Sequence, residues 1–154
     1  ANKSNIPTIV DPKKENFKLY NKCTIFKPNL CEIKEGIDIE FNENDLDELR
    51  DATDKLKLLI DANAILLTLS EKGICINSAN NFNYIPAFKR NINDISGAGD
   101  TVVAVASLCL ASRLDYENTA LLSNLAGGIV CEHLGVVPIN KEELILEAIK
   151  TVSS

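Results

Sequence analysis

Short runs of apolar residues alternate along the chain with longer segments in which apolar residues recur every three or four positions. The short runs predict buried strands, and the longer segments predict helices that bury one face. We expect strands at 6–10, 23–26, 64–69, 74–76 and 84–88, and the main helices at 45–60, 101–112, 116–133 and 141–150. This alternation predicts a three-layer α/β fold with a mainly parallel sheet and helices on both of its faces.

Some of these segments carry more detailed signals. The segment 101–112 is apolar on nearly all sides, which predicts a central and buried helix. The sequence Glu71-Lys72-Gly73 predicts a tight turn that joins two strands as a hairpin. Asp115 stands where a helix N-cap is expected, and Asn140 has Glu143 at capping-box spacing. The helix at 45–60 is expected to bury one apolar face, made of Leu46, Leu49, Ala52, Leu56, Leu59 and Ile60.

The composition is that of a globular protein, with 45% hydrophobic and 25% charged residues among 154. A chain of this length buries enough surface for one core, and it contains no repeat or linker, so we expect a single domain over 1–154. The formal net charge of −6 argues against nucleic acid or an anionic membrane as a partner. No apolar run reaches the roughly 18 residues of a membrane span, and no signal peptide is recognised.

The cysteines and the histidine predict no chemistry. The five cysteines are odd in number, form no Cys-x-x-Cys pair and partly lie in apolar runs, where a thiol behaves as a small hydrophobic side chain. A chain of this size does not need disulfides for stability, so we expect a reducing, cytoplasmic location. His133, near the end of a predicted helix, is interpreted as structural.

The segment Asp94-Ile95-Ser96-Gly97-Ala98-Gly99-Asp100 stands directly before the apolar helix at 101–112. Its two glycines let the backbone approach a ligand, and the first N–H groups of the helix, with the positive end of the dipole behind them, favour a phosphate. A carboxylate beside a bound phosphate repels it. Asp100 is therefore better explained as a general base that takes a proton from a hydroxyl attacking that phosphate.

A plain strand-to-helix turn with an acidic residue in the first helical turn is the alternative explanation of this segment. Two other phosphate-binding loops are excluded by spacing. Val102 stands where a dinucleotide-binding fingerprint requires its third glycine, and the chain contains no Gly-Lys-Ser/Thr sequence for a P-loop.

The same segment resembles the C-terminal signature of the ribokinase-like (PfkB) sugar kinases, Asp-Thr-x-Gly-Ala-Gly-Asp. Ile95 replaces the usual threonine, and this departure resembles the heptose-phosphate kinase branch of that family. Four further segments, all earlier in the chain, fall in family order, so that the resemblance extends from about Ile6 to Leu144. Three of them are Val10-Asp11-Pro12-Lys13, the Asn-x-x-Glu segment at 28–32, and Tyr84-Ile85-Pro86-Ala87. The segment 68–73 is similar to the Thr-x-Gly-x-x-Gly nucleotide loop, with Ser70 in place of a glycine.

The resemblance implies a role for each matching position. Asp100 is the implied base for a sugar hydroxyl, and an anion hole is formed by Gly97, Ala98 and Gly99. Asn29 and Glu32 are the implied organisers of Mg²⁺ and its waters. Taken alone, Asn29 is better explained as a helix cap with Glu32 as its capping-box partner, and the two interpretations do not exclude each other. The implied nucleotide contacts are Thr68, Ser70 and Gly73, with Asn124 beside the adenine or ribose. In some members a monovalent cation, K⁺, lies at the positions of Asp94 and Ser96, with Gly135 on the far side.

The resemblance also implies a ribokinase-like fold that is only partly present. The N-terminal half, with the lid and most sugar-binding residues of the family, has no counterpart here, so the chain is interpreted as a partial domain. The implied reaction transfers the γ-phosphoryl group of ATP to the hydroxyl of a sugar or sugar phosphate, preferably a heptose phosphate. We expect the segment alone to be inactive and to associate with itself or with the missing half. The alternatives are a nucleotide-binding regulatory module without catalysis, and an interaction domain in which the glycine turn is only structural.

Overall fold

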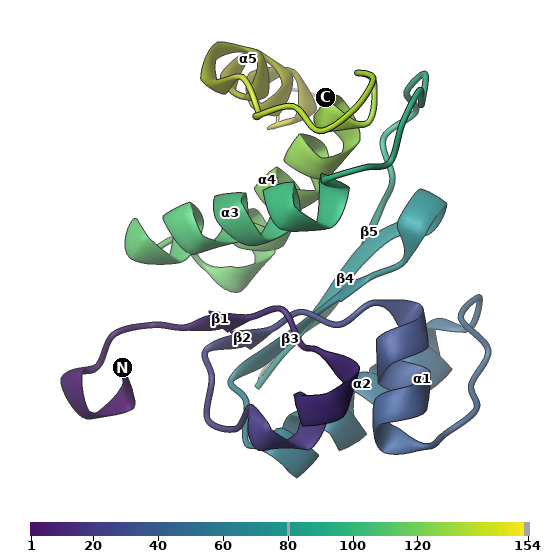
Figure 1. Ribbon diagram of the computed structural model, residues 1–154, viewed down its shortest axis with the longest axis vertical. Helices are drawn as coiled ribbons and strands as arrows, with labels where there is room; N and C mark the ends of the chain where they lie inside the picture. The colour runs from purple at the N-terminus through teal and green to yellow at the C-terminus, as the bar shows by residue number, and fades with distance from the viewer. Residues whose placement is uncertain (80, 153–154) are drawn as a thin grey trace. The chain divides into compact units, whose positions relative to one another are not determined.

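The computed structural model describes residues 1–79 and 81–152, which form two compact units. Unit 1 is Ala1–Ile85 and unit 2 is Pro86–Ser154. Unit 1 contains nearly all of the sheet together with two α-helices and three short 3₁₀ helices, and unit 2 contains three α-helices (Figure 1). The expectation of a single domain over 1–154 stays a prediction.

The sheet has five strands in the order β1-β2-β3-β4-β5. Strands β1 and β2, and likewise β2 and β3, pair in parallel, whereas β3 and β4 are antiparallel. This confirms the predicted α/β class with a mostly parallel sheet, and it confirms the hairpin after the third strand. The strand bounds are β1 Ile9–Val10, β2 Ile25–Phe26, β3 Ala64–Thr68, β4 Gly73–Ser78 and β5 Phe82–Pro86.

The helices of unit 1 are η1 Asn2–Ser4, η2 Lys14–Leu19, α1 Leu30–Ile37, α2 Leu46–Ile60 and η3 Ser70–Lys72. Apolar residues of α1, α2 and η2 are buried in the core beside the sheet, whereas η1 and η3 bury no residue. Asp45 caps α2, because its side chain accepts the N–H groups of Asp47 and Glu48. The predicted face of α2 is correct at four positions and wrong at Leu46 and Leu59, which are exposed. Thr53 is buried on that face instead, since its hydroxyl donates to helix carbonyls and needs no water.

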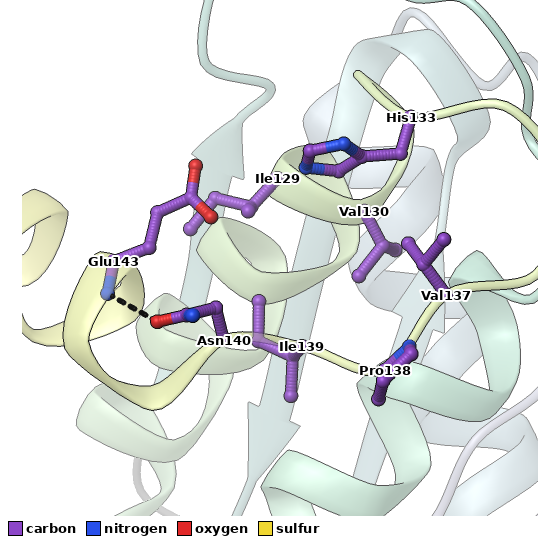
Figure 2. A pocket seen from close by; sticks show the side chains of 8 residues that line it. All are labelled: Ile129, Val130, His133, Val137, Pro138, Ile139, Asn140 and Glu143. Carbon is purple, nitrogen blue, oxygen red and sulfur yellow. Dashed lines mark hydrogen bonds between the residues drawn. The ribbon is translucent and has the colours of Figure 1, made fainter.

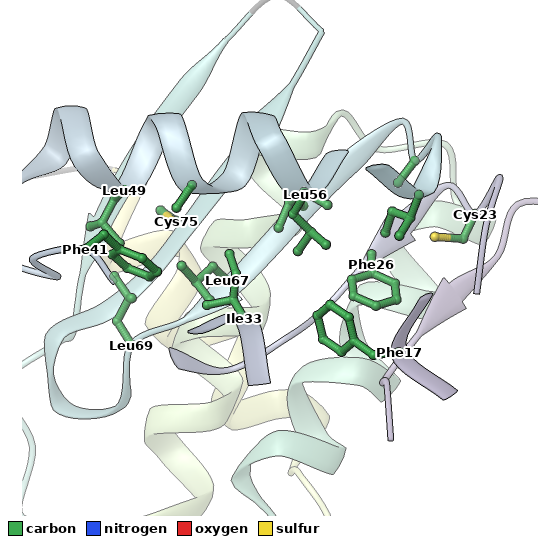
Figure 3. Packing of buried hydrophobic residues seen from close by; sticks show 14 residues of the cluster. Phe17, Cys23, Phe26, Ile33, Phe41, Leu49, Leu56, Leu67, Leu69 and Cys75 are labelled. Atoms are coloured by element: carbon green, nitrogen blue, oxygen red, sulfur yellow. The ribbon is translucent and has the colours of Figure 1, made fainter. Parts of the chain in front are cut away.

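The core of unit 1 lies between the sheet and the helices α1, α2 and η2 (Figure 3). Phe17 of η2 meets Phe26 of β2 edge to face, with ring centroids 5.1 Å apart. Leu56 of α2 is fully buried against this cluster. The alternating residues Ile65 and Leu67 of β3 also point into it, as expected for one face of a strand.

Unit 2 consists of α3 (Ala98–Ala111), α4 (Tyr116–Val130) and α5 (Lys141–Val152). Helices α3 and α4 lie close together at Gly127, where a Cβ atom would be 3.0 Å from a methyl carbon of Val102. As predicted, Asp115 caps α4 and Asn140 accepts the N–H of Glu143. The segment 101–112 was predicted to form a central and buried helix. It is buried on one face, which includes Val102 and Val105, whereas Leu108 on another face is 69% exposed.

Several element boundaries differ from the predicted ones. Helix α3 begins three residues early because Gly97 adopts a conformation that starts the helix. Strand β5 lies two residues before the predicted strand, and α4 ends at Val130 rather than at His133. The strands predicted at 6–10 and 23–26 are each reduced to two paired residues. Within the described ranges, every helix is too short or too polar to cross a membrane.

Substitution of Ser70 by glycine is expected to stabilise the protein. Ser70 has φ 54°, in the left-handed region, where a side chain costs about 1–2 kcal/mol. Glycine removes this cost but adds about 0.5–1 kcal/mol of chain entropy, so we expect a net gain of up to about 1.5 kcal/mol in the free energy of unfolding. Urea denaturation measures the difference. The same change at Ser112, where φ is −83°, is the control, and Ser70→Gly must be the more stable variant if the argument is correct.

Candidate active site

The segment 94–100 forms a tight turn that leads directly into α3. Gly97 is the N-cap of this helix, with φ 80° and ψ −2°. A side chain at this position would be strained by the left-handed backbone and would also bring its Cβ to 3.0 Å from Val136 Cγ1. The Ala98 N–H donates to the Ile95 carbonyl at 3.3 Å within the turn. The turn therefore depends on glycine at position 97 for two separate reasons.

Unbonded backbone N–H groups are the chemically important feature of this turn. In the part of the chain that the structure describes, the N–H groups of Gly97, Gly99 and Asp100 have no acceptor. A Cβ at Gly99 would meet nothing within 4 Å, so this residue borders open space. Since the positive end of the α3 dipole lies behind these groups, they suit an anion. The Ala98 N–H is already bonded, and thus contributes less than the sequence suggests.

Asp100 lies in the first turn of α3, next to these N–H groups, and its carboxylate is exposed. It has no hydrogen-bond or ion-pair partner among residues 1–79 and 81–152. A carboxylate that no protein group engages is available to accept a proton from a ligand. The role of general base stays a prediction.

Asp94 fastens the turn to the chain that follows α4. Its Oδ1 accepts the Ser96 N–H and its Oδ2 accepts the Gly135 N–H, both at 2.9 Å. These hydrogen bonds, first those from Ser96 and then that from Gly135, lower the pKa of the Asp94 carboxyl group below its usual value. The backbone N–H groups of Asn93 and Asp94 both donate to the Cys131 carbonyl. Both carboxylate oxygens thus have structural partners at the predicted monovalent-cation position.

Asn29 and Glu32 form a capping box at the start of α1. The Asn29 side chain accepts the Glu32 N–H at 2.9 Å, and Glu32 Oε2 accepts the Asn29 N–H at 2.8 Å. This confirms the helix-cap interpretation of the pair. Glu32 Oε1 has no partner within the described residues, so the carboxylate retains an oxygen that suits a hydrated Mg²⁺ ion.

Thr68 lies beside Asn29, where β2 and β3 end. The two residues form an isolated parallel bridge, and the Thr68 N–H and hydroxyl both donate to the Pro28 carbonyl, at 3.1 and 3.4 Å. This edge is the carboxyl end of the parallel strands, where open α/β sheets bind ligands. The structure therefore brings together two residues that the sequence placed at a nucleotide site from separate motifs.

The turn from β3 to β4 is held by Lys72 and Tyr84. The Lys72 ammonium donates to Asn44 Oδ1 at 2.8 Å and lies 3.5 Å from Glu43, and the Tyr84 hydroxyl donates to the Lys72 carbonyl at 2.6 Å. Lys34 donates to Glu43 at 3.0 Å and, together with weaker contributions, lowers the pKa of Glu43 to about 2. These contacts restrain the turn that contains Ser70 and Gly73.

The predicted site residues thus fall into two groups, one in each unit. The group in unit 1 is Asn29, Glu32, Thr68, Ser70 and Gly73, and the group in unit 2 is Asp94, Ser96, Gly97, Ala98, Gly99, Asp100 and Asn124. Asn124 lies on α4, and its side-chain amide donates to the Pro86 carbonyl at 3.0 Å. Within the described part of the chain, no three His, Cys, Asp or Glu side chains are arranged to hold a metal ion.

Two buried charged residues were not identified from the sequence. Lys27 is only 4% exposed and pairs with Asp11 at 2.9 Å, and these residues directly follow β2 and β1. The only signal was a lysine placed between an apolar strand and a Pro-Asn pair. Arg90, in the connection between β5 and α3, pairs with Glu132 and Glu147 and had no sequence signal at all.

Burial raises the pKa of the Cys23 thiol to about 11 and that of Cys75 to about 12, which disfavours the reactive thiolate.

His133 is exposed and lines a cavity of about 200 Å³ in unit 2 (Figure 2). The other residues around this cavity are Ile129, Val130, Val137, Pro138, Ile139, Asn140 and Glu143, and none of them was predicted to bind a ligand.

Residues 1–143 match the family model of the pfkB family carbohydrate kinases. The chain belongs to this family. The bifunctional protein HldE of Histophilus somni is 35% identical over 147 residues, which are 94% of this chain and 30% of that protein. HldE of Koribacter versatilis is 38% identical over 140 residues, which are 91% of this chain and 28% of that protein. The chain therefore spans about a third or less of these relatives.

Solved structures of other proteins share the fold. Phosphofructokinase-2 of Escherichia coli, in complex with potassium, superposes with a TM-score of 0.87 at 20% identity, over 100% of this chain and 50% of that one. Ribokinase of Arabidopsis thaliana, complexed with ribose and ATP, gives a TM-score of 0.81 at 19% identity, over 96% of this chain and 49% of that one. The fold is thus ribokinase-like, and the chain corresponds to about half of each of these proteins.

Acidification is expected to release Asp94 from its two amides only below pH 3.8, the usual pKa of its carboxyl group. Because the folded state lowers this pKa, the stabilisation is present above 3.8 and is lost as the pH falls through the folded value. In an NMR titration, the amide protons of Ser96 and Gly135 should shift together, with a midpoint below 3.8. The Asp94→Asn variant should abolish both shifts, and a shared midpoint above 3.8 would contradict the geometry.

Proposed function

We propose that the chain is the nucleotide-binding and catalytic-base half of an ATP-dependent sugar kinase. The observation that carries this proposal is the glycine turn at 94–100, where three unbonded N–H groups adjoin an exposed carboxylate. Membership of the pfkB family supports it. In this proposal the γ-phosphoryl group of ATP passes to a sugar hydroxyl and ADP leaves.

Asp100 acts as the general base in the proposed reaction. It takes the proton of the attacking hydroxyl as the new oxygen–phosphorus bond forms and the bond to the ADP oxygen breaks. The turn formed by Gly97, Ala98 and Gly99 is the anion hole, and its unbonded N–H groups are those of Gly97, Gly99 and Asp100. Donors fixed before the reaction stabilise the negative charge on the transferred group without reorganisation.

The groups in unit 1 suit the nucleotide and its metal ion. Glu32, with its unpartnered Oε1, and Asn29 would hold Mg²⁺ through water, and the bound ion neutralises phosphate charge. The turn of Thr68, Ser70 and Gly73 would lie against the nucleotide, as would Asn124 from unit 2. K⁺ at Asp94 and Ser96 is a further part of the proposal, since phosphofructokinase-2 of E. coli was solved with potassium.

A heptose phosphate is the proposed acceptor, in the cytoplasm. HldE proteins are 32–38% identical to this chain, and the departure from the family signature at Ile95 resembles the heptose-phosphate branch. The family member from E. coli that was solved with fructose-6-phosphate supports a phosphorylated sugar as a class of acceptor. The missing N-terminal half is the proposed partner, because the solved relatives are about twice as long.

A nucleotide-binding module without catalysis is the second candidate. One observation favours it, namely that no described protein group orients the Asp100 carboxylate. The two candidates differ in product formation. The kinase forms phosphorylated sugar and loses this activity when the carboxylate is removed, whereas the binding module forms none and binds ATP with or without the carboxylate.

Replacement of Asp100 by Asn is expected to lower kcat by about 10²–10⁴-fold while ATP affinity changes little, because a base accelerates only the chemical step. The assay uses the chain together with the N-terminal half of the kinase domain and follows ADP formation with heptose phosphate. Asp51→Asn, at an exposed position on α2, is the control and should leave kcat unchanged. An equal loss of ATP affinity and kcat would contradict the role of base.

The 154-residue chain alone is expected to show less than about 1% of the activity it has with its N-terminal half, because the sugar is not positioned and water is not excluded. Co-expression with the N-terminal half of Haemophilus influenzae HldE, a relative 34% identical to this chain, provides the comparison. Calorimetric titration with ATP and Mg²⁺ shows whether nucleotide binding needs the partner. Full turnover by the chain alone would contradict the proposal, and absence of nucleotide binding in both samples would favour an interaction domain.

A further inference from the structure

A buried arginine holds the irregular connection between β5 and α3. The Arg90 side chain is only 9% exposed. Its Nη1 donates to Glu132 at 2.7 Å and its Nη2 donates to Glu147 at 2.9 Å. Glu132 lies two residues after the end of α4, and Glu147 lies on α5, so one guanidinium group connects three segments of unit 2.

The surroundings of Arg90 are shaped for this side chain. A Cβ at Gly128 of α4 would be 3.1 Å from Arg90 Cδ and 3.2 Å from Nε, so the arginine lies against a place without a side chain. Its Nε is buried and has no hydrogen-bond partner within the described residues. A buried unpartnered donor is unfavourable, so the arrangement persists only because the two ion pairs and the packing outweigh it.

The connection that Arg90 holds ends in the glycine turn. Three residues after Arg90, the Asn93 side chain donates to the Glu132 carbonyl at 2.7 Å, and its backbone N–H donates to the Cys131 carbonyl at 2.8 Å. Asp94 then accepts the Gly135 N–H. Residues 90–94 are thus fastened at several points to the chain that follows α4, and the unbonded N–H groups begin at Gly97.

We propose that Arg90 is a positioning residue for the glycine turn: by joining Glu132 and Glu147 it fixes the turn whose N–H groups and Asp100 carry the proposed phosphoryl transfer. This inference rests on the proposed function. The turn has few contacts of its own, since only Ser96 and Ala98 donate hydrogen bonds within it. Donors of an anion hole must be fixed before the reaction, so the restraint has to come from neighbouring segments.

Arginine is required because the two acceptors lie on different segments. The planar guanidinium presents two N–H groups in a rigid fork, so that it reaches both carboxylates at once, whereas lysine provides a single point charge. Arg90→Lys is therefore expected to retain part of the restraint, and Arg90→Met to lose it. Lys89 is the matched control, because it is the neighbouring cation, is exposed and has no partner among the described residues.

The first experiment measures amide hydrogen exchange by NMR and needs no kinase activity. In Arg90→Met we expect exchange at Asn93, Asp94 and Gly135 to be at least tenfold faster, with Ala106 in the middle of α3 unchanged. Arg90→Lys should lie in between, and Lys89→Met should match the wild type. If Arg90→Met proves unfolded by circular dichroism, Glu147→Gln, which keeps a hydrogen-bond acceptor, replaces it. Unchanged exchange at the three amides in a folded variant would overturn the proposal.

The second experiment measures kinetics with the N-terminal half present. Arg90→Met should lower kcat at least tenfold and leave the KM for ATP within about twofold, and Arg90→Lys should recover part of the loss. If Arg90→Met merely reduced the amount of folded protein, kcat calculated per folded molecule would not fall, and Arg90→Lys would have no loss in kcat to recover. Faster exchange with unchanged kcat would overturn the positioning role. An inactive wild type would instead refute the proposed function and leave the exchange result to decide the structural restraint.

Discussion

Backbone N–H groups without acceptors at the start of α3 are the constraint on which the site of unit 2 depends. The first N–H groups of a helix are normally satisfied by a capping side chain, as at α1, α2 and α4. At α3 no side chain caps the helix, because the N-cap is Gly97. The start of α3 thus lacks the side-chain cap that α1, α2 and α4 have, and a helix start without a cap leaves its N–H groups available to an anion.

The chain that leads into the free amides is held by contacts with segments outside the turn. Asp94 accepts two amides, one from the turn and one from Gly135, and Cys131 accepts two more from the turn side. Arg90 adds the only charged connection to α4 and α5 that this segment shows in the described structure. The structural contacts lie on one side of Gly97, and the unsatisfied donors begin at Gly97 itself.

In unit 1, the candidate site residues Asn29 and Glu32 also cap a helix. At the start of α1, Asn29 and Glu32 each accept the backbone N–H of the other with one oxygen, and the second oxygen of Glu32 has no partner among the described residues. The helix-cap and metal-site interpretations are therefore compatible, as the lone pairs of a carboxylate allow. Pro28 and Thr68 then keep the capping box next to the end of β3.

Much of the fold could be predicted from local patterns. The apolar runs located the strands, and Glu71-Lys72-Gly73 located the hairpin, because both signals depend on neighbouring residues alone. The exposure of Leu108 could not be predicted, since an apolar helix shows no sign of which face lacks a neighbour. For the site, the glycine turn was evident from its residues, whereas Arg90 was not, because its partners lie 42 and 57 residues further along the chain. The left-handed backbone of Ser70 could not be predicted either, because the identity of a serine does not show that the surrounding structure imposes a conformation suited to glycine.

The two partners of the ion pair between Lys27 and Asp11, at the ends of β2 and β1, differ in how much stability is lost when the other is removed. Lys27 is almost fully enclosed, whereas the Asp11 side chain is 32% exposed. Loss of the aspartate would leave an ammonium group inside the protein with no counter-ion, the situation that costs about 3–5 kcal/mol when a buried pair is broken. Loss of the lysine would leave a carboxylate that water still reaches, at a smaller cost. The order of substitutions therefore matters at this edge of the sheet. Lys27 has to be replaced by a neutral residue before Asp11 can be replaced at low cost.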